Sequence, residues 1–314
     1  MRVTTTLLSL VCSAACSAPE APPASPSEVT STGALRIEED ADGLRVFMGE
    51  ELFCGYDRRN ELRPILWPVN GPSGAAVTRA YPQAEGVAGE ASDHPHHQSV
   101  WYGHGAVNGH DFWHAGHGER VVDLGDMEVE GPAEEGVLSR GFLMSWQVKG
   151  EELCQEERVM RFRGTSEERW VDFEVTLHAN QTDLRFGDTK EGTFAVRLAP
   201  TLRLKGAVAA GSIKNSAGDT GGKTWGKRAA WVEYSGPVGG ETVYVSLHDH
   251  SENLRHPTWW HARDYGLLGA NPFGIHDFER KPAGTGDFIL PKGERLTQRY
   301  SLRVGDTPYA AQAK

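Results

Sequence analysis

The chain has 314 residues, of which 39% are hydrophobic and 24% are charged, as in ordinary soluble globular proteins. Its net charge of −11 argues against a basic surface for nucleic acid or for anionic lipid, so nucleic-acid binding is not expected. No segment after the N-terminus approaches the roughly 20 consecutive apolar residues that a transmembrane helix needs.

The first 34 residues have the pattern of an export signal followed by a tether. Arg2 precedes the apolar run 7–11, and small residues then lead to Cys16. This order resembles a bacterial lipoprotein signal over residues 1–16, with a diacylglycerol on the sulfur of Cys16; an ordinary secretory signal is the alternative. Residues 17–34 are rich in proline and serine, which predicts a flexible tether. We therefore expect an exported, membrane-anchored lipoprotein facing the periplasm or the cell exterior, which touches a membrane only through this lipid.

Residues 35–306 have the texture of β-strands and predict a single domain, followed by a short C-terminal tail over 307–314. The clearest alternation of apolar and polar residues runs through Trp170–His178 and Arg295–Val304. Shorter strands are expected at Leu44–Met48, Val121–Glu130, Gly136–Val148, Leu153–Phe162, Phe194–Leu198, Trp231–Tyr234 and Val243–Leu247. The fold class is therefore predicted to be all-β, a large antiparallel β-sandwich.

Two long segments, 67–113 and 248–281, interrupt this pattern and are expected to be functional loops. Two cysteines, Cys54 and Cys154, lie in the predicted domain. Export leaves a disulfide between them open, and neither has a second cysteine at metal-ligand spacing.

The first long segment carries seven of the thirteen histidines, between His94 and His117. Pro95 is expected to keep this part extended, so that His94 and His96 point to one side and His97 to the other. Two imidazoles on one side could hold a divalent metal with a third ligand from another strand. Alternatively, the histidines line a sugar-sized cleft and serve as acid, base or hydrogen-bonding groups.

A second group of polar residues, Asp188, Lys190 and Glu191, lies in a glycine-bounded turn after an expected strand. Glu191 could act as a general acid or base if burial tunes its pKa. The alternative is a polar turn whose charges pair with one another in solvent.

The second long segment contains Trp259, Trp260, His261 and Arg263. Paired tryptophans can stack on a sugar ring, while His261 and Arg263 can donate hydrogen bonds. The planar guanidinium of Arg263 suits a carboxylate such as that of a uronic acid. The alternative is a buried aromatic corner in which Arg263 pairs with Asp264.

Several motifs, in this order, resemble the bacterial DUF6807 family over about Leu62 to Val304. They are Val77-Thr78-Arg79, Asp93-His94-Pro95-His96-His97, Val107-Asn108-Gly109-His110-Asp111-Phe112-Trp113, Gly187-Asp188-Thr189-Lys190-Glu191-Gly192, Trp225-Gly226-Lys227 and the run from Pro257 to Leu267. The family often carries the label "PmoA family" or methane oxygenase PmoA. That label implies several transmembrane helices, so we do not expect a genuine membrane methane monooxygenase subunit.

The resemblance implies an exported protein near carbohydrate utilisation, with a sandwich similar to the galactose-mutarotase-like supersandwich. Mutarotase-like enzymes use a His/Glu acid–base pair, which by analogy gives His96 or His261 with Glu191, and Asp188 as a second carboxylate. The expected substrate contacts are Arg79, His97, Trp101, Asn108, Lys190, Trp259, Trp260 and Arg263.

The expected function is therefore to act on or bind carbohydrate, a small sugar or an oligosaccharide, in a His/Trp-lined cleft by acid–base chemistry. Hydrolysis, elimination and epimerisation all remain open. One alternative is a non-catalytic carbohydrate-binding lipoprotein. The other is a metal-dependent enzyme with His94 and His96 as ligands.

Overall fold

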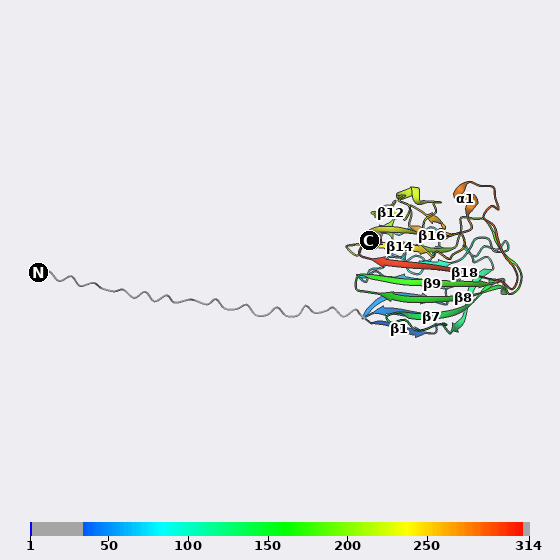
Figure 1. Ribbon diagram of the computed structural model, residues 1–314, viewed down its shortest axis with the longest axis horizontal. Helices are drawn as coiled ribbons and strands as arrows, with labels where there is room; N and C mark the ends of the chain where they lie inside the picture. Colours follow the sequence, from blue (N-terminus) through cyan, green and yellow to red (C-terminus); the bar gives the residue numbers. More distant parts are fainter. Residues whose placement is uncertain (2–33, 310–314) are drawn as a thin grey trace. The chain divides into compact units, whose positions relative to one another are not determined.

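The computed structural model describes Met1 and residues 34–309 (Figure 1). Cys16, and with it the expected signal cleavage and lipid anchor, lies outside the described residues, as do residues 310–314. Among the residues that are described, no helix combines the length and the apolar character needed to cross a membrane.

Two antiparallel sheets, each of eight strands, form the framework of residues 34–309. In spatial order the first sheet consists of β1 (Leu35–Asp40), β2 (Gly43–Met48), β3 (Glu51–Asp57), β4 (Ile65–Val69), β5 (Val100–Tyr102), β11 (Phe194–Arg197), β16 (Leu267–Asn271) and β15 (Trp259–Ala262). The second consists of β12 (Ser212–Asn215), β13 (Trp231–Val238), β14 (Glu241–Asp249), β18 (Arg295–Gly305), β9 (Glu168–His178), β8 (Glu151–Gly164), β7 (Leu138–Val148) and β6 (Glu119–Met127).

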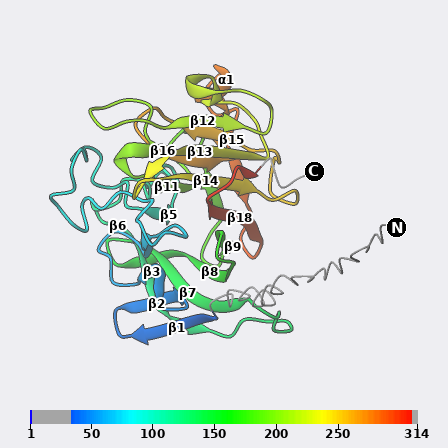
Figure 2. The same cartoon turned by 90° about the vertical axis from the view of Figure 1, so that its left-hand side faces the viewer.

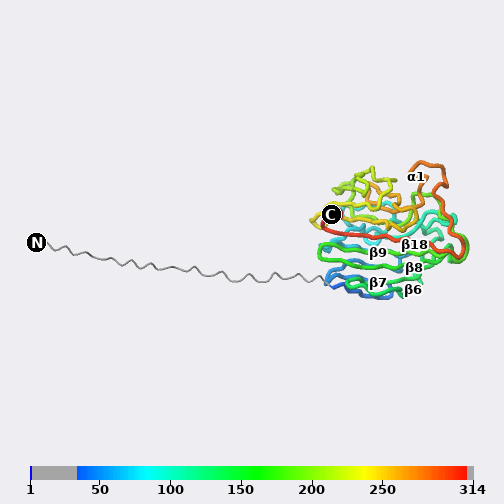
Figure 3. The backbone as a smooth tube through the Cα atoms, viewed as in Figure 1, coloured from blue at the N-terminus to red at the C-terminus, as the bar shows by residue number. Residues whose placement is uncertain are grey.

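The views of the ribbon and the backbone tube show how these strands are arranged. In Figure 2, β1, β2 and β3 lie at one end of the domain, and β12, β13 and β15 lie at the other. Figure 3 shows the long strands β18, β9, β8, β7 and β6 side by side. A small third sheet pairs β10 (Leu184–Phe186) with β17 (Phe288–Leu290). The remaining elements are the 3-10 turns η1 (Pro200–Leu202) and η2 (Gly221–Thr224) and the short helix α1 (Ile275–Glu279).

The alternation in the sequence decides which face of each long strand enters the core. In β9, the side chains of Val171, Phe173, Val175 and Leu177 are buried in one hydrophobic cluster that both large sheets share. In β18, Leu296, Tyr300, Leu302 and Val304 join the same cluster. Burial of each such side chain contributes about 1.5–3 kcal/mol, which stabilises the sandwich. The predicted all-β sandwich is confirmed.

The two segments predicted to be loops contain strands that the sequence did not reveal. Strands β4 and β5 lie partly or wholly within 67–113, and β15, β16 and α1 lie within 248–281. In β5, β15 and β16 every residue is buried. Because both faces of these strands are covered, the sequence shows no alternation there.

Cys54 and Cys154 are both buried and both free, so the disulfide that the sequence left open is not formed. Burial raises the pKa of each thiol well above its usual value. These cysteines therefore behave as small apolar core residues.

Candidate functional site

The outer face of the first sheet carries a row of residues that connects two of the predicted motifs. In register, Trp101 of β5 lies opposite Ala195 of β11, Ala195 opposite Gly269 of β16, and Gly269 opposite His261 of β15. Their chain neighbours, such as Val100, Val196 and Leu268, point into the shared core. His261 therefore belongs to the same sheet face as Trp101, with two small residues between them.

The histidine block, defined here as residues 94–97, lies next to this face and forms a tight turn. The backbone N–H of His97 donates to the carbonyl of His94 at 2.9 Å, and His94 has a φ of 44°. The rings of His94 and His97 are consequently stacked, with centroids 4.8 Å apart, while His96 contacts His114 at 4.2 Å. The expected extended segment, with His94 and His96 on one side and His97 on the other, is wrong because the turn overrides the preference that Pro95 imposes.

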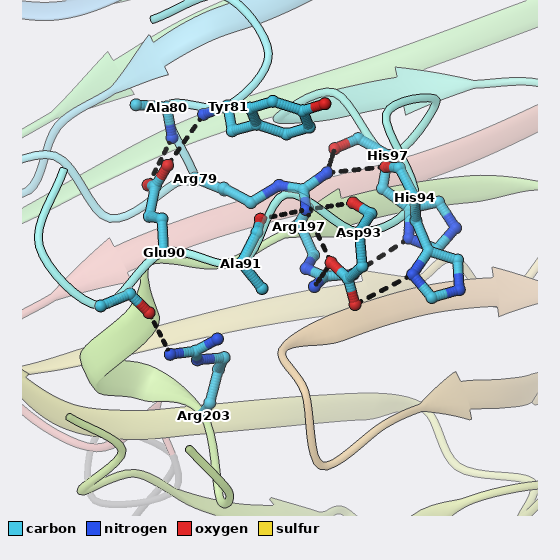
Figure 4. A network of polar contacts seen from close by, with 11 residues as sticks. Arg79, Ala80, Tyr81, Glu90, Ala91, Asp93, His94, His97, Arg197 and Arg203 are labelled. Carbon is cyan, nitrogen blue, oxygen red and sulfur yellow. Dashed lines mark hydrogen bonds and ion pairs between the residues drawn. The ribbon is translucent and has the colours of Figure 1, made fainter. Parts of the chain in front are cut away.

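Two buried arginines hold this turn in place (Figure 4). The Arg79 guanidinium donates to the carbonyls of Asp93, His94 and His97 at 2.8 Å each, and to Asp93 Oδ1 at 3.0 Å. The Arg197 guanidinium donates to the same Oδ1 at 2.8 Å and contacts His97 Nδ1 at 3.1 Å. Arg79, expected to contact substrate, has a side chain only 2% exposed and uses its donors to shape the loop.

Asp93 and His94 form an oriented carboxylate–imidazole pair at the surface of this turn. Asp93 Oδ2 lies 3.0 Å from His94 Nδ1, and the two side chains are 39% and 43% exposed. Partial burial raises the pKa of Asp93, but Arg197, His94 and Arg79 together hold it below its usual value. The carboxylate is therefore ionised at neutral pH and can hold the proton of His94 on Nδ1, which leaves Nε2 as the free lone pair.

Tyr265, in the turn between β15 and β16, lies against this pair. Its ring is parallel to that of His94 at 5.4 Å, and the guanidinium carbons of Arg197 and Arg263 lie 4.6 Å and 5.4 Å from its centroid. Burial raises the pKa of Tyr265, although Arg263 and Arg197 oppose this shift. The phenol therefore keeps its proton at neutral pH and can donate it.

Arg263 carries a charge that the surrounding protein does not pair. Within the described residues its guanidinium makes no hydrogen bond or ion pair, and its contact is with the Tyr265 ring. The alternative of an Arg263–Asp264 pair is not found, because Asp264 pairs with Lys205 at 2.6 Å. A half-buried, unpaired guanidinium is suited to a carboxylate ligand.

The polar turn after β10, which carries Lys190 and Glu191, contacts His261 through its backbone. His261 Nδ1 lies 3.1 Å from the Lys190 carbonyl, and Lys190 Nζ pairs with Glu191 Oε1 at 3.1 Å. The three segments that carry His94, Glu191 and Arg263 therefore each lie against Tyr265 or His261.

The other predicted site residues make structural contacts. Asp188 accepts hydrogen bonds from the backbone N–H groups of His276 at 2.9 Å and Gly286 at 2.7 Å. Asn108 accepts from the backbone N–H of Arg185 at 2.6 Å. The tryptophans expected as sugar platforms are buried, and their faces pack against protein: Trp101, Trp259 and Trp260. The alternative of a buried aromatic corner fits their placement.

Several histidines are kept neutral by their surroundings. Mainly because they are buried, His96 and His261 each have a pKa lowered to about 3. Burial also lowers the pKa of His104 to about 4, although the hydrogen bond to the Gly187 carbonyl opposes it. His96 lines a separate cavity of about 930 Å³ with His114 and His117. Across residues 34–309, no group of three or more His, Cys, Asp or Glu side chains is arranged to hold a metal ion.

These buried histidines predict an acid-sensitive fold. Below about pH 6.5 the unfolded chain protonates each histidine, while the native protein keeps His104 neutral down to about pH 4, so the free energy of unfolding falls as the pH falls through this window. In His104→Gln, which keeps a donor for the Gly187 carbonyl, we expect a slope shallower by about 1.4 kcal/mol per pH unit. Urea titrations of the wild type and the variant from pH 4 to 8 measure the slope of the unfolding free energy against pH. Above pH 7 the slopes of the two proteins should agree. Equal slopes below pH 6 would contradict the prediction.

Sequence reasoning missed Asp93, Arg197 and Tyr265 as members of this site. Asp93 directly precedes His94 and was visible as a potential partner, but the turn that aims its carboxylate at Nδ1 is not encoded locally. Tyr265 lies in the motif from Pro257 to Leu267, but no role was predicted for it, and no sequence motif marked Arg197 as a neighbour of the histidines.

Comparison with known proteins identifies one family whose profile matches the chain, and several solved structures that are remotely similar to it. The profile of "Family of unknown function (DUF6807)" matches residues 44–313. No curated protein matches the sequence. A galactose mutarotase-like protein from Lactobacillus casei is 8% identical, with a TM-score of 0.38, over 86% of this chain and 100% of its own. A galactose mutarotase-like protein from Clostridium acetobutylicum is 8% identical, with a TM-score of 0.36, over 88% and 99%. A putative aldose 1-epimerase from Escherichia coli is 11% identical, with a TM-score of 0.31, over 87% and 99%.

Proposed function

This chain belongs to the DUF6807 family, as its motifs predict, and since the function of that family is unknown, we propose one from the site: acid–base chemistry on a carbohydrate at the Asp93–His94 pair. The observation that carries the proposal is the half-exposed His94 imidazole, oriented by Asp93 at 3.0 Å and stacked beside Tyr265.

His94 is better placed to act as a base than the histidines that the family analogy favours. Burial lowers the pKa of His96 and of His261 to about 3, so near neutral pH they are weak bases and do not exist as imidazolium acids. His94 lies at the surface, and its partner Asp93 stabilises the imidazolium that forms when Nε2 accepts a proton. The proposed base is therefore His94, with Asp93 as its positioning residue.

The proposed substrate is a sugar that carries a carboxylate, a uronic acid. The unpaired Arg263 guanidinium would bind this carboxylate and stabilise the negative charge that develops on it. His94 would remove the proton from the carbon next to the carboxylate, and the electrons of the C–H bond would move into the carboxylate. Delivery of a proton from water to the opposite face, with release of the proton on His94 to solvent, completes an epimerisation. Loss of the neighbouring C–O bond, with a proton from Tyr265 to the leaving oxygen, completes an elimination.

We further propose that the protein works outside the cytoplasm as a lipoprotein. The support is the apolar run 7–11, the following small residues and Cys16, ahead of a proline-rich tether. Mass spectrometry of the mature N-terminus tests this: a lipidated Cys16 is expected, and an unmodified, uncleaved N-terminus would overturn it.

A turnover screen tests the proposed chemistry. Purified protein is incubated with polyuronates (alginate, pectate and glucuronan oligosaccharides) and with neutral oligosaccharides of matched length; ultraviolet absorbance reports elimination, and proton NMR in deuterated water reports epimerisation. We expect conversion of at least one uronate, and a KM raised at least tenfold in Arg263→Gln but not in the exposed Arg45→Gln. Binding without conversion would favour the non-catalytic binder, and equal conversion of neutral sugars would overturn the role of Arg263.

A further inference from the structure

A second row of side chains crosses the outer face of the other large sheet. From β13 to β8 the register places Trp231 opposite His248, His248 opposite Ser301, Ser301 opposite Asp172, and Asp172 opposite Arg161. The chain neighbours of this row, among them Val232, Leu247, Leu302, Val171 and Phe162, are buried in the core. The row therefore faces away from the first sheet and from the site of Asp93 and His94.

A cavity of about 480 Å³ lies over this row, and aromatic rings gather at one end of it. After β18 the chain returns across the sheet, where the backbone N–H of Tyr309 donates to Glu233 Oε2 at 2.9 Å. The Tyr309 ring lies 4.3 Å from that of His248 and 5.7 Å from that of Trp231, measured between centroids. Trp231, His248 and Tyr309 are all half-buried, so part of each ring remains open to a ligand.

Ion pairs fix the polar side chains along the rest of the groove. Arg163 Nε lies 3.0 Å from Asp172 Oδ2, and the hydroxyl of Ser301 donates to Asp172 Oδ1 at 2.5 Å. Arg299 pairs with Glu174 at 2.9 Å, and Arg161 approaches the same carboxylate at 3.9 Å. The groove thus presents donors and acceptors whose positions are already set before a ligand binds.

The charges that line the groove are paired with one another. Arg163 pairs with Asp172, and Arg299 and Arg161 share Glu174. Charges that are already paired do not select an anion or a cation. Open aromatic rings together with fixed planar donors and acceptors match a ligand with apolar ring faces and many hydroxyl groups.

We propose that this groove is a second binding site, for a neutral linear oligosaccharide that lies across the strands. Neighbouring strands are about 4.8 Å apart, which is comparable to the rise of one sugar unit in an extended glycan. Each of the five strands can therefore present one side chain of the row to successive sugar units, with Trp231 stacking at one end. This site does not rest on the acid–base function, and it would take a neutral glycan where the other would take a uronate.

Calorimetric titration of the purified full-length chain with neutral hexaoses tests this inference. The probes are cellohexaose, mannohexaose and xylohexaose, with their monosaccharides and hexagalacturonate for comparison. We expect one neutral hexaose to bind at least tenfold more tightly than its monosaccharide and than hexagalacturonate. Trp231→Ala should weaken this binding at least tenfold. Tyr244→Ala serves as the control and should not weaken binding. Tyr244 is half-buried and lies on the same face of β14 as His248, but it does not line the cavity.

A second variant keeps the test decisive if Trp231→Ala fails to fold. Arg161→Ala removes a side chain that makes one distant ion pair, so the fold should tolerate it while hexaose binding weakens. The inference is overturned if no neutral hexaose binds, or if binding survives both substitutions. His94→Gln should leave hexaose binding unchanged, so failure of this site and failure of the acid–base site give different results.

Discussion

Replacing His94 by glutamine is expected to lower kcat on the uronate substrate by about 10²–10⁴-fold, the usual contribution of a positioned general base. Glutamine has a similar length and can still hydrogen-bond to Asp93, but it cannot accept a proton at neutral pH. Asp93→Asn should also lower kcat, because an amide can present its N–H to Nδ1 and so favour the wrong tautomer of His94. Initial rates under substrate saturation measure both effects.

The chain offers a closely matched control for this experiment. His114 Nδ1 lies 2.7 Å from Asp111 Oδ2, and the two side chains are 45% and 44% exposed, much like His94 and Asp93. This pair lacks a neighbouring Tyr265 and Arg263. His114→Gln should therefore leave kcat within about twofold of the wild type, a margin well inside the effect expected of a general base. Equal losses in His94→Gln and His114→Gln, or no loss in either, would contradict the assignment of the base.

Replacing Arg79 by alanine is expected to lower the free energy of unfolding by about 3 kcal/mol or more, because each buried acceptor left without its donor costs about 1–3 kcal/mol. The substitution leaves the carbonyls of Asp93, His94 and His97 without their donor, inside a loop whose conformation depends on them. Arg79→Lys should recover little of this loss, because a single ammonium cannot donate to several carbonyls at once with the geometry of a guanidinium. Urea denaturation followed by circular dichroism measures the change.

The same variants distinguish the two possible roles of Arg79, which are direct contact with substrate and support of the loop from Asp93 to His97. Arg45→Ala, at a side chain 60% exposed, serves as the control and should change stability by no more than about 0.5 kcal/mol. If Arg79→Ala were as stable as the wild type but bound the uronate more weakly, the expectation from the sequence, a direct substrate contact, would be correct. A large loss of stability supports the scaffold role that its burial indicates.

The position of His94 relative to Asp93 depends on this scaffold. Arg79 and Arg197 both reach Asp93 Oδ1, so the other carboxylate oxygen, Oδ2, faces His94 Nδ1. Two cations on one oxygen also keep Asp93 ionised, which the orientation of the imidazole requires. The geometry of the Asp93–His94 pair thus depends on buried charges contributed by β11 and by the segment after β4, and not on residues 94–97 alone.

Local patterns in the sequence were sufficient for the fold class and for most of the second sheet. Strands β9 and β18 are open to solvent on one face, so their alternation reports directly which side chains enter the core. The ordered motifs were sufficient for the family. The motifs also indicated that the segments of His94, Glu191 and Arg263 are functional. Packing alone does not account for so many histidine, carboxylate and guanidinium groups in glycine-rich loops.

The roles within those segments were decided only by the tertiary structure. Trp101, Trp259 and Trp260 look like binding aromatics in the sequence, but strands covered on both faces bury them. The ring of His94 stacks on that of His97 because buried arginines bind the turn carbonyls, a long-range effect that the local preference imposed by Pro95 does not reveal. Strand alternation is set by each residue's immediate neighbours along the chain, and so the sequence displays it. Burial, charge pairing and pKa depend on residues distant in the chain, and so only the folded arrangement determines which of the thirteen histidines are buried and which lie at the surface beside a carboxylate.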